Sequence, residues 1–206
     1  MSGRYRTLLA DPPWPMRAVS RPWAGAGGRR HRATAWPYPV MSLEDICALP
    51  VGPMAEDDAH LFLWVPASFN REGDGVRVAR AWGFEPLNEI VWAKPNFGLG
   101  RFPRPQHEIL LVCRRGSLPF ALRDEGSIQT WALPRLKGNG GRVHSAKPDG
   151  AIDLIERASP GPYAELFARR ARFGWDYPFG DESLGTGVMP STTNGTDAGE
   201  PTSETA

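Results

Sequence analysis

The sequence predicts an α/β fold, with a mainly parallel sheet flanked by helices on both faces, and three observations lead to it. Short apolar runs of strand length alternate along the chain with segments of helical spacing, as in parallel sheets with crossover helices. The 206 residues include 23 glycines and 21 prolines, which predicts many ordered loops rather than long helices. A chain of this length buries a sizeable core, so we expect one domain over residues 1–182.

The predicted strands are short, apolar and bounded by turn-forming residues. In chain order they are Thr7–Ala10, His60–Val65, Glu89–Ala93, Glu108–Cys113 and Ala164–Ala168. A loop rich in proline and glycine, Pro95–Pro105, separates the third strand from the fourth. We find no internal repeat, so each strand is expected to hold a distinct place in one sheet.

Helices are predicted between these strands. Ser42–Leu49 is a short helix in which Ser42 is the cap and Asp45 completes a capping box. The spacing over Asn70–Trp82 predicts an amphipathic helix that ends at Gly83. Pro148–Arg157 is a third helix, with its proline in the first turn, where the missing N–H costs nothing.

The run Asp11-Pro12-Pro13-Trp14 follows the first strand directly. Proline fixes φ and has no N–H donor, so Pro12 and Pro13 cannot extend the ladder. The strand therefore ends with the Asp11 carboxylate at the carboxyl edge of the sheet, where ligands bind in open α/β folds. An acid, a free carbonyl and an aromatic ring on a rigid turn suit the 6-amino group of adenine.

The chemistry of that amine explains these residue types, because its lone pair is delocalised into the ring. The Asp11 carboxylate and the Pro12 carbonyl can each accept one N–H, which draws the nitrogen towards sp³ and aims its lone pair at an electrophile. A hydrogen bond to an ionised acceptor is roughly twice as strong as a neutral one, which favours Asp over Asn. Trp14 can stack on the base, a contact worth about 1–3 kcal/mol. The alternative is a structural turn with Trp14 in the core.

Asp11-Pro12-Pro13-Trp14 after an apolar strand resembles the catalytic motif of the adenine N(6)-methyltransferase family that includes the eukaryotic messenger-RNA writer and small bacterial and phage proteins. Other stretches resemble that family in its order, and together they span residues 5–182. They are Tyr38–Ser42, Leu61–Val65, Gly83–Phe84, Val91–Asn96, His107–Leu111, His144–Pro148 and Pro160–Arg169. The resemblance implies a Rossmann-like methyltransferase domain over residues 1–182, with a permuted order in which the catalytic motif precedes the cofactor motif.

The resemblance also implies S-adenosyl-L-methionine as the cofactor, although no ordinary glycine-rich nucleotide motif is present. The cofactor strand comes late, at Glu165–Arg169, with Ala168 where the family has glycine. His107 stands where the eukaryotic member has a lysine for the methionine carboxylate, and an acidic pair suits the ribose hydroxyls because carboxylates only accept hydrogen bonds. The implied cofactor residues are His107, His144, Ser145, Lys147, Phe167, Arg169, Asp181 and Glu182.

Between Asp11 and Glu44 the chain carries five arginines and no acid, with Trp23 and Trp36 among them. Arginines interleaved with aromatics suggest a loop that binds phosphates and holds a flipped-out base. The alternative is an ordinary solvated loop, and the same alternative stands for the positions just past the third strand. The predicted substrate-binding residues are Arg17, Arg29, Arg30, Arg32, Lys94, Asn96 and Arg172.

Net charge, the cysteine and histidine counts and the lack of long apolar runs indicate which kind of protein this is. The formal net charge is +1, and residues 183–206 carry three acids and no Lys or Arg, so residues 1–182 carry 1 + 3 = +4. We expect 183–206 to be a disordered low-complexity tail. Two distant cysteines and four scattered histidines predict no metal site and a cytoplasmic protein. No apolar run approaches the ~18 residues of a membrane span, and no signal peptide precedes the first strand.

These observations predict a methyltransferase that uses S-adenosyl-L-methionine to methylate the 6-amino group of adenine in nucleic acid, with DNA expected rather than RNA. A partner protein could supply target recognition, since no separate recognition domain is visible. Alternatives stay open: an RNA adenine methyltransferase, a non-catalytic nucleic-acid-binding subunit of a methyltransferase complex, or methylation of a protein or small molecule. Intact Asp11 and Trp14 weigh against the non-catalytic subunit.

Overall fold

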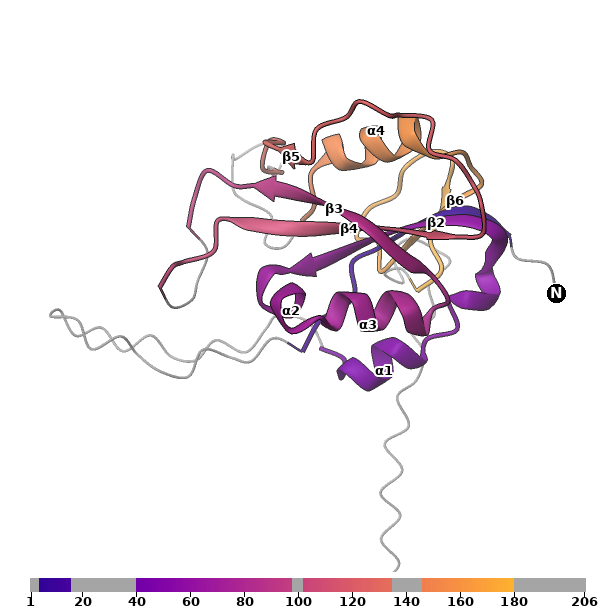
Figure 1. Cartoon of the computed structure of the whole chain (residues 1–206), viewed down its shortest axis with the longest axis horizontal. Helices are drawn as coiled ribbons and strands as arrows, with labels where there is room; N and C mark the ends of the chain where they lie inside the picture. The colour runs from indigo at the N-terminus through magenta and orange to yellow at the C-terminus, as the bar shows by residue number, and fades with distance from the viewer. Residues whose placement is uncertain (1–3, 16–39, 98–101, 135–145, 180–206) are drawn as a thin grey trace, which may run out of the picture.

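The computed structural model describes residues 4–15, 40–97, 102–134 and 146–179, and all statements below concern these ranges (Figure 1). A single sheet runs through them in the order β5-β3-β4-β2-β1-β6-β7. Its strands are β1 (Tyr5–Ala10), β2 (Ala55–Pro66), β3 (Glu85–Ala93), β4 (His107–Arg115), β5 (Ile128–Gln129), β6 (Tyr163–Leu166) and β7 (Trp175–Asp176). The helices are α1 (Leu43–Ala48), α2 (Ala67–Glu72), α3 (Asp74–Ala81) and α4 (Asp149–Ala158), with a 3-10 turn at Gly52–Met54.

The predicted mainly parallel sheet is confirmed, with one reversed strand. The pairs β1/β2, β1/β6, β3/β5 and β6/β7 are parallel, whereas β4 is antiparallel to both of its neighbours, β2 and β3. β3 and β4 follow each other in the chain and pair antiparallel, so they form a hairpin; the described residues between them contain no helix. Because β4 is reversed, its first residues lie at the edge where the parallel strands end.

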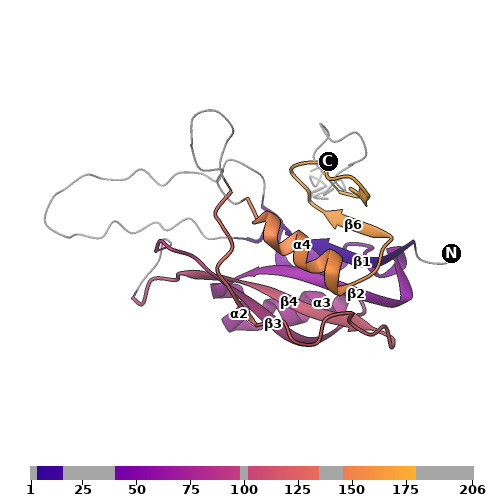
Figure 2. The same ribbon diagram turned by 90° about the horizontal axis from the view of Figure 1, so that it is seen from above.

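Helices cover both faces of the sheet, as predicted. Figure 2 shows α4 on one face and α2 and α3 on the other. Side chains alternate between faces along a strand, so neighbouring residues of β1 enter different cores. Leu8 packs with Ile46 and Trp82 under α1 and α3, whereas Leu9 packs with Phe62 and Ile155 under α4.

The predicted helix Asn70–Trp82 is wrong as a single element. Gly73 adopts φ +79°, a left-handed conformation that ends α2 and precedes the start of α3. Glycine reaches this region without the steric cost that other residues meet, so it breaks the helix despite the continuous amphipathic spacing. The predicted stop at Gly83, at φ +81°, is confirmed directly after α3.

The other boundaries differ by smaller amounts. The Ser42 cap is confirmed: its hydroxyl accepts from the Asp45 N–H at 3.0 Å. The predicted strand Ala164–Ala168 stops at Leu166, because Phe167 adopts φ +65° and cannot continue the ladder. The strands β5 and β7, two residues each, were not predicted, since a run that short has no periodicity to detect.

Candidate active site

Asp11 lies directly after β1 at the carboxyl edge of the parallel strands, as predicted. The chain then turns sharply: the Trp14 N–H donates to the Pro12 carbonyl at 2.8 Å, and the Met41 N–H donates to the Pro13 carbonyl at 2.9 Å. The Asp11 N–H reaches the Leu166 carbonyl at the end of β6, at 3.4 Å. The two prolines thus hold the carboxylate between the ends of two parallel strands.

A row of alternating charges begins at Asp11. Lys147 Nζ donates to both Asp11 oxygens, at 2.8 and 2.7 Å, and lies 3.4 Å from Glu108 Oε2. Glu108 in turn pairs with Lys94. The four side chains are only 17–24% exposed, so their attractions are screened far less than those of surface ion pairs. We call Asp11, Lys147, Glu108 and Lys94 the charged row.

Burial and neighbouring charges act against each other in this row. Burial raises the pKa of Asp11, and the Lys147 ammonium only partly offsets that rise. For Glu108, burial also raises the pKa, but Lys147 and Lys94 outweigh it and the net pKa is lowered. Burial lowers the pKa of Lys147, yet Asp11 and Glu108 outweigh it and the net pKa is raised. The lysine therefore stays charged, and Asp11 is the member whose proton is most easily gained.

The alternation of side chains explains why these residues meet. Asp11 follows Leu9 on the α4 face of β1, and Glu108 shares that face of β4 with Leu110. Lys147 stands just before α4, which lies over the same face. Glu108 was not singled out from the sequence, because only a reversed strand brings its first residues to this edge. The available signal was the short Pro95–Pro105 loop, which leaves no room for a crossover helix.

Trp14 is not placed for stacking on a base, which corrects the prediction. Its side chain is 3% exposed, its Nε1–H donates to the Trp64 carbonyl at 2.9 Å, and its ring stacks on Phe69 with centroids 5.3 Å apart. The ring lies in the core on the α1 and α3 side of the sheet. Trp14 therefore anchors the turn that holds Asp11, and the core alternative is the one that the geometry favours.

The other predicted site residues near Asp11 separate into two groups. Lys147 is buried in contact with Asp11, and Lys94 is a member of the charged row rather than a solvated loop residue. Asn96 is exposed just beyond β3. His107 is also exposed, and alternation along β4 turns it away from the face that carries Glu108. Glu108, next to His107, thus makes the contact with Lys147.

A second set of predicted residues follows β6. Phe167 packs partly buried against the core, and Arg169 is exposed. Arg172 is held by α4: its guanidinium donates to Glu156 at 2.9 and 2.8 Å and to Asp153 at 2.7 Å. These bonds hold the guanidinium against α4, where Arg172 also lines a small cavity, and its predicted substrate contact stays a prediction.

A small cavity of about 170 Å³ lies between β6 and α4, and Glu165 lines it together with Asp149 and Arg170. Burial, with the nearby Asp11 charge, raises the pKa of Glu165 to about 7. Glu165 is predicted from the sequence only as part of the cofactor strand Glu165–Arg169, and the local pattern does not indicate that it lies beside Asp11. The sheet register explains it, because Glu165 pairs with Leu9 on the same face as Asp11.

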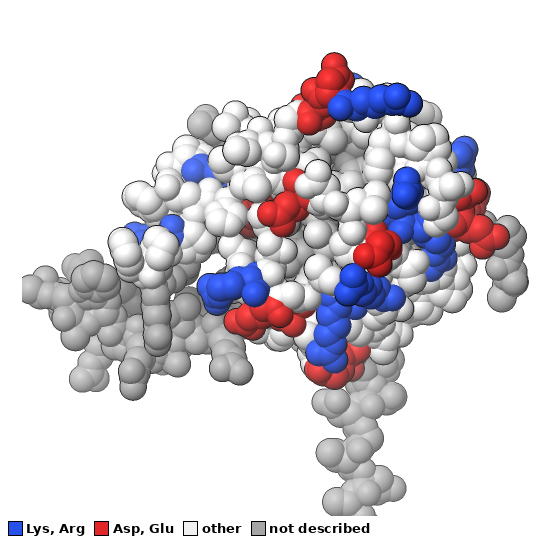
Figure 3. All heavy atoms as spheres, in the orientation of Figure 1, with Lys and Arg blue, Asp and Glu red and all other residues white. Residues whose placement is uncertain are grey.

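The remaining predicted residues lie outside the described ranges, and their roles stay predictions. They are Arg17, Arg29, Arg30, Arg32, His144, Ser145, Asp181 and Glu182. Within the described ranges no group of three or more His, Cys, Asp or Glu side chains is arranged to hold a metal ion. Figure 3 shows acidic and basic side chains interspersed on one face of the molecule. In the described part of the chain, every helix is too short or too polar to cross a bilayer.

The comparison with known families agrees with this arrangement. A family model described as MT-A70 matches residues 5–182, which include every residue of the charged row. The chain belongs to the MT-A70 family. Its relatives make this a family of adenine N(6)-methyltransferases, so the resemblance carried by the Asp-Pro-Pro-Trp run is confirmed.

Relatives of this MT-A70 chain fall into two groups by length. The type II methyltransferase M.MunI of a Mycoplasma species is 28% identical over 84% of this chain and 76% of its own length. The N(6)-adenosine-methyltransferase MT-A70-like protein of Drosophila melanogaster is 27% identical over 81% of the chain. The human N(6)-adenosine-methyltransferase catalytic subunit METTL3 is 26% identical over the same share. The chain spans only about a quarter of the length of these two eukaryotic relatives.

Proposed function

We propose that this chain is an S-adenosylmethionine-dependent methyltransferase that methylates the 6-amino group of adenine in DNA. The observation that carries the proposal is the Asp11 carboxylate, held at the sheet edge by two prolines and paired with a buried lysine, in a chain of the MT-A70 family. The proposal gives each member of the site a chemical task.

Asp11 is proposed to orient the amine. An ionised carboxylate has about four acceptor sites on its two oxygens, so it can bind Lys147 and still accept an N–H. The Pro12 carbonyl keeps a second lone pair beyond its bond to Trp14, and can accept the other N–H. Two fixed acceptors hold the lone pair in line for transfer, and such orientation supplies much of the catalysis in group transfer.

Lys147 is proposed to keep Asp11 ionised. Its ammonium opposes the rise in the Asp11 pKa caused by burial. Lys147 also lies within reach of Glu108, and this second carboxylate helps to hold the ammonium beside Asp11. Glu108 thereby stabilises the lysine when the amine occupies Asp11.

The residues beside Asp11 suit S-adenosylmethionine, which supplies an electrophilic methyl group when bound. The cavity between β6 and α4 is adjacent to Asp11, and it presents the Glu165 carboxylate to hydroxyl groups. Lys147 is a cation for a carboxylate at the methionine end. Asp181 and Glu182, predicted for the ribose, complete the proposed cofactor set with His144 and Ser145.

DNA is proposed as the substrate because of the similarity to the DNA methyltransferase M.MunI, which is 28% identical over 84% of the chain. Flipping adenine from a duplex costs a few kcal/mol, which contacts to phosphates by the arginine-rich segment would offset. The proposal includes a cytoplasmic location and allows a partner protein for target recognition.

The deciding experiment is methyl transfer from labelled S-adenosylmethionine to duplex DNA, single-stranded DNA and RNA, followed by nucleoside analysis. We expect N(6)-methyladenine in DNA. The same product in RNA alone would assign the chain to RNA instead. No transfer to any substrate, with cofactor bound, would contradict the catalytic assignment of the isolated chain and favour a subunit that needs a partner.

A further inference from the structure

A second, larger cavity lies on the same face of the sheet as the charged row. It measures about 900 Å³ and opens between the end of β3, residues 130–134 and the start of α4. Lys94 belongs to both features, since it lines the cavity and also pairs with Glu108. The cavity therefore begins where the charged row that starts at Asp11 ends.

Trp131 gives this cavity an aromatic wall. Its backbone carbonyl accepts the Trp92 Nε1–H at 3.0 Å, and its ring packs edge-on against Trp64, with centroids 6.4 Å apart. The ring also lies tightly over Gly150, where an added Cβ would come within 2.4 Å of Trp131 Cδ1. The ring is thus fixed in place while part of it stays accessible from the cavity.

The polar groups around the ring can recognise a nucleobase. Asn96 and Thr130 are exposed at the cavity, and an amide with a hydroxyl provides both donors and acceptors for a base edge. Lys94 adds a cation that a neighbouring phosphate would satisfy. An aromatic wall, polar groups for a base edge and a nearby cation are together the usual features of single-strand nucleic-acid sites.

The cavity is separate from the one beside β6 and Glu165. Asp149 at the start of α4 is the one lining residue that the two cavities share. Its carboxylate pairs with Arg170, on the β6 side. Glu165, which is proposed to contact the cofactor, lines the smaller cavity only, so the larger cavity is available for the nucleic acid.

We propose that the larger cavity binds the base of a nucleotide adjacent to the target adenine, stacked on Trp131 with its edge against Asn96 and Thr130. This inference rests on the proposed function, which places the target amine at Asp11. It gives the chain a means of selecting sequence within the domain itself, because the bound neighbour is read by a fixed ring and two polar side chains.

The test is a double-mutant cycle on the full chain, in which one change is made in the enzyme and the other in the substrate. Methyl transfer is measured on an oligonucleotide with normal neighbours, and on versions with an abasic site on the 5′ or the 3′ side of the target. Loss of one stacked base is expected to lower kcat/KM about ten-fold for wild type, on one side only. Trp131→Leu should lose about the same factor on the normal substrate and show no further loss on that abasic substrate.

Matched variants separate stacking from folding. Trp131→Phe keeps a ring and should retain most of the activity, whereas Ile128→Ala, an exposed change on β5 outside the cavity, should behave as wild type. Asn96→Ala with Thr130→Val should change the preference among bases at the coupled position. The KM for S-adenosylmethionine should stay constant in all these variants.

Three results would overturn the inference. In the first, Trp131→Leu and the abasic substrate lower kcat/KM independently, so that their losses multiply. In the second, wild type methylates both abasic substrates as fast as the normal one. In the third, the variants raise the KM for S-adenosylmethionine and show no coupling to the abasic site. If wild type transfers no methyl group at all, the proposed function fails. The cavity is then tested by the same cycle in Kd, measured by anisotropy with labelled single-stranded oligonucleotides.

Discussion

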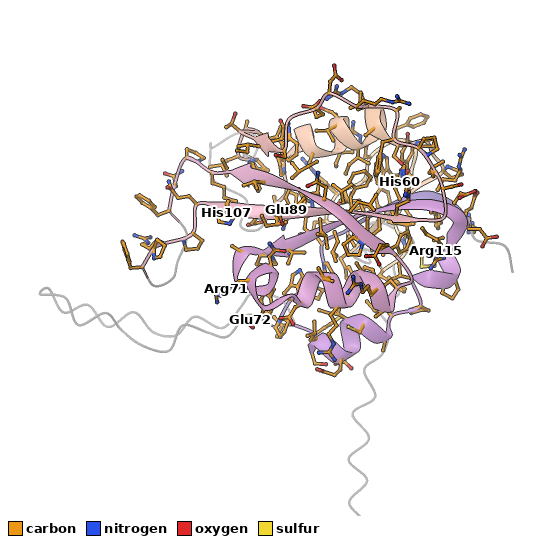
Figure 4. All side chains as sticks on the ribbon, in the orientation of Figure 1. His60, Arg71, Glu72, Glu89, His107 and Arg115 are labelled. Carbon is orange, nitrogen blue, oxygen red and sulfur yellow. The ribbon has the colours of Figure 1, made fainter. Side chains whose placement is uncertain are left out.

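Two polar clusters lie at the two ends of α4; both involve β1, but they differ in charge, burial and access. The charged row lies near Lys147, before the helix begins. A second cluster lies where the helix ends, at Ser159, and includes Thr7 and His60. In Figure 4, His60 is labelled at the right of the sheet and His107, at the start of β4, at the left.

The cluster at Ser159 is neutral and closed. Thr7 and His60 are fully buried, and Ser159 is 2% exposed. The two nitrogens of His60 contact the Ser159 hydroxyl at 2.7 Å and the Leu118 carbonyl at 2.9 Å, and its ring stacks on Phe120. Burial lowers the pKa of His60, which keeps the ring uncharged. Every polar side-chain group there has a partner within the protein, so the cluster joins β1, β2 and α4.

The charged row instead consists of acids and bases that lie partly exposed at the sheet edge. Among the described residues, the hydrogen bonds of its carboxylates use only part of their acceptor capacity. A histidine in contact with a serine is a common catalytic pair, whereas an aspartate followed by two prolines is typical of a turn. The comparison teaches that access and unused hydrogen-bonding capacity, rather than residue type, distinguish the reactive end of α4 from the structural end.

The largest expected effect is the loss of activity in Asp11→Ala. The variant removes the carboxylate that orients the amine and leaves the remaining lysine contact to Glu108. We expect methyl transfer to fall by about 10²–10³-fold or more, in the range of other pre-organised electrostatic groups. Binding of S-adenosylmethionine, measured by calorimetry, should survive. Turnover retained near the wild-type level would remove Asp11 from the mechanism.

Lys147→Met should have the next largest effect. Because the lysine opposes the rise in the Asp11 pKa, its removal raises that pKa further. The acid limb of the kcat/KM profile should therefore move to higher pH, with activity lost first at low pH. Lys94→Met is the matched control, because it removes a cation that touches Glu108 but not Asp11. Equal pH shifts in both variants would contradict a direct role for Lys147 at Asp11.

Much of the reactive end could be predicted from sequence. Pro12 and Pro13 force the strand to stop, which places Asp11 at the edge, and Lys147 came from the family resemblance. Glu108 was missed because its place depends on the reversal of β4, for which the short Pro95–Pro105 loop was the one signal in the sequence. Trp14 was misjudged because stacking on a base and packing on Phe69 require the same ring.

The cluster at Ser159 was harder to predict from the sequence. Thr7, His60 and Ser159 are far apart in the chain, and only the register of β1 with β2 and the end of α4 brings them together. The break at Gly73 shows the same limit, since amphipathic spacing continues across it. Local patterns predict the elements well, whereas contacts between distant elements depend on the whole fold.

Glu165 lies on the strand next to Asp11, near the charged row. Its ionisation is expected to change the free energy of unfolding with pH. Its pKa is about 7 in the folded protein against an ordinary 4.5, so folding favours the protonated form. Below about pH 4.5 Glu165 is protonated in both the folded and the unfolded state, so the free energy of unfolding does not change with its ionisation. Between about pH 4.5 and pH 7 the free energy of unfolding falls, because the group ionises more readily in the unfolded state. Glu165→Gln should thus stabilise the protein by up to about 3 kcal/mol at pH 8, and hardly at pH 4.5.

Urea unfolding of cofactor-free wild type and Glu165→Gln, at both pH values, checks this prediction. Asp149→Asn, at another carboxylate that lines the same cavity, is the control. Asp149 pairs with Arg170, so its neutralisation should not produce the gain at high pH. A pH-independent difference between wild type and Glu165→Gln would show that burial does not govern the ionisation of Glu165.

The smallest effect on catalysis is expected at the closed cluster. Ser159→Ala removes the hydroxyl that contacts both His60 and Thr7, and leaves buried polar groups with fewer partners. Losing a buried hydrogen-bond partner costs about 1–3 kcal/mol, which thermal unfolding would report as a lower Tm. Below that Tm, kcat/KM should match wild type, since the cluster lies at the far end of α4 from Asp11. A lower kcat/KM in fully folded Ser159→Ala would mean that the clusters at the two ends of α4 are coupled. A cluster whose polar groups are all paired within the protein would then not be purely structural.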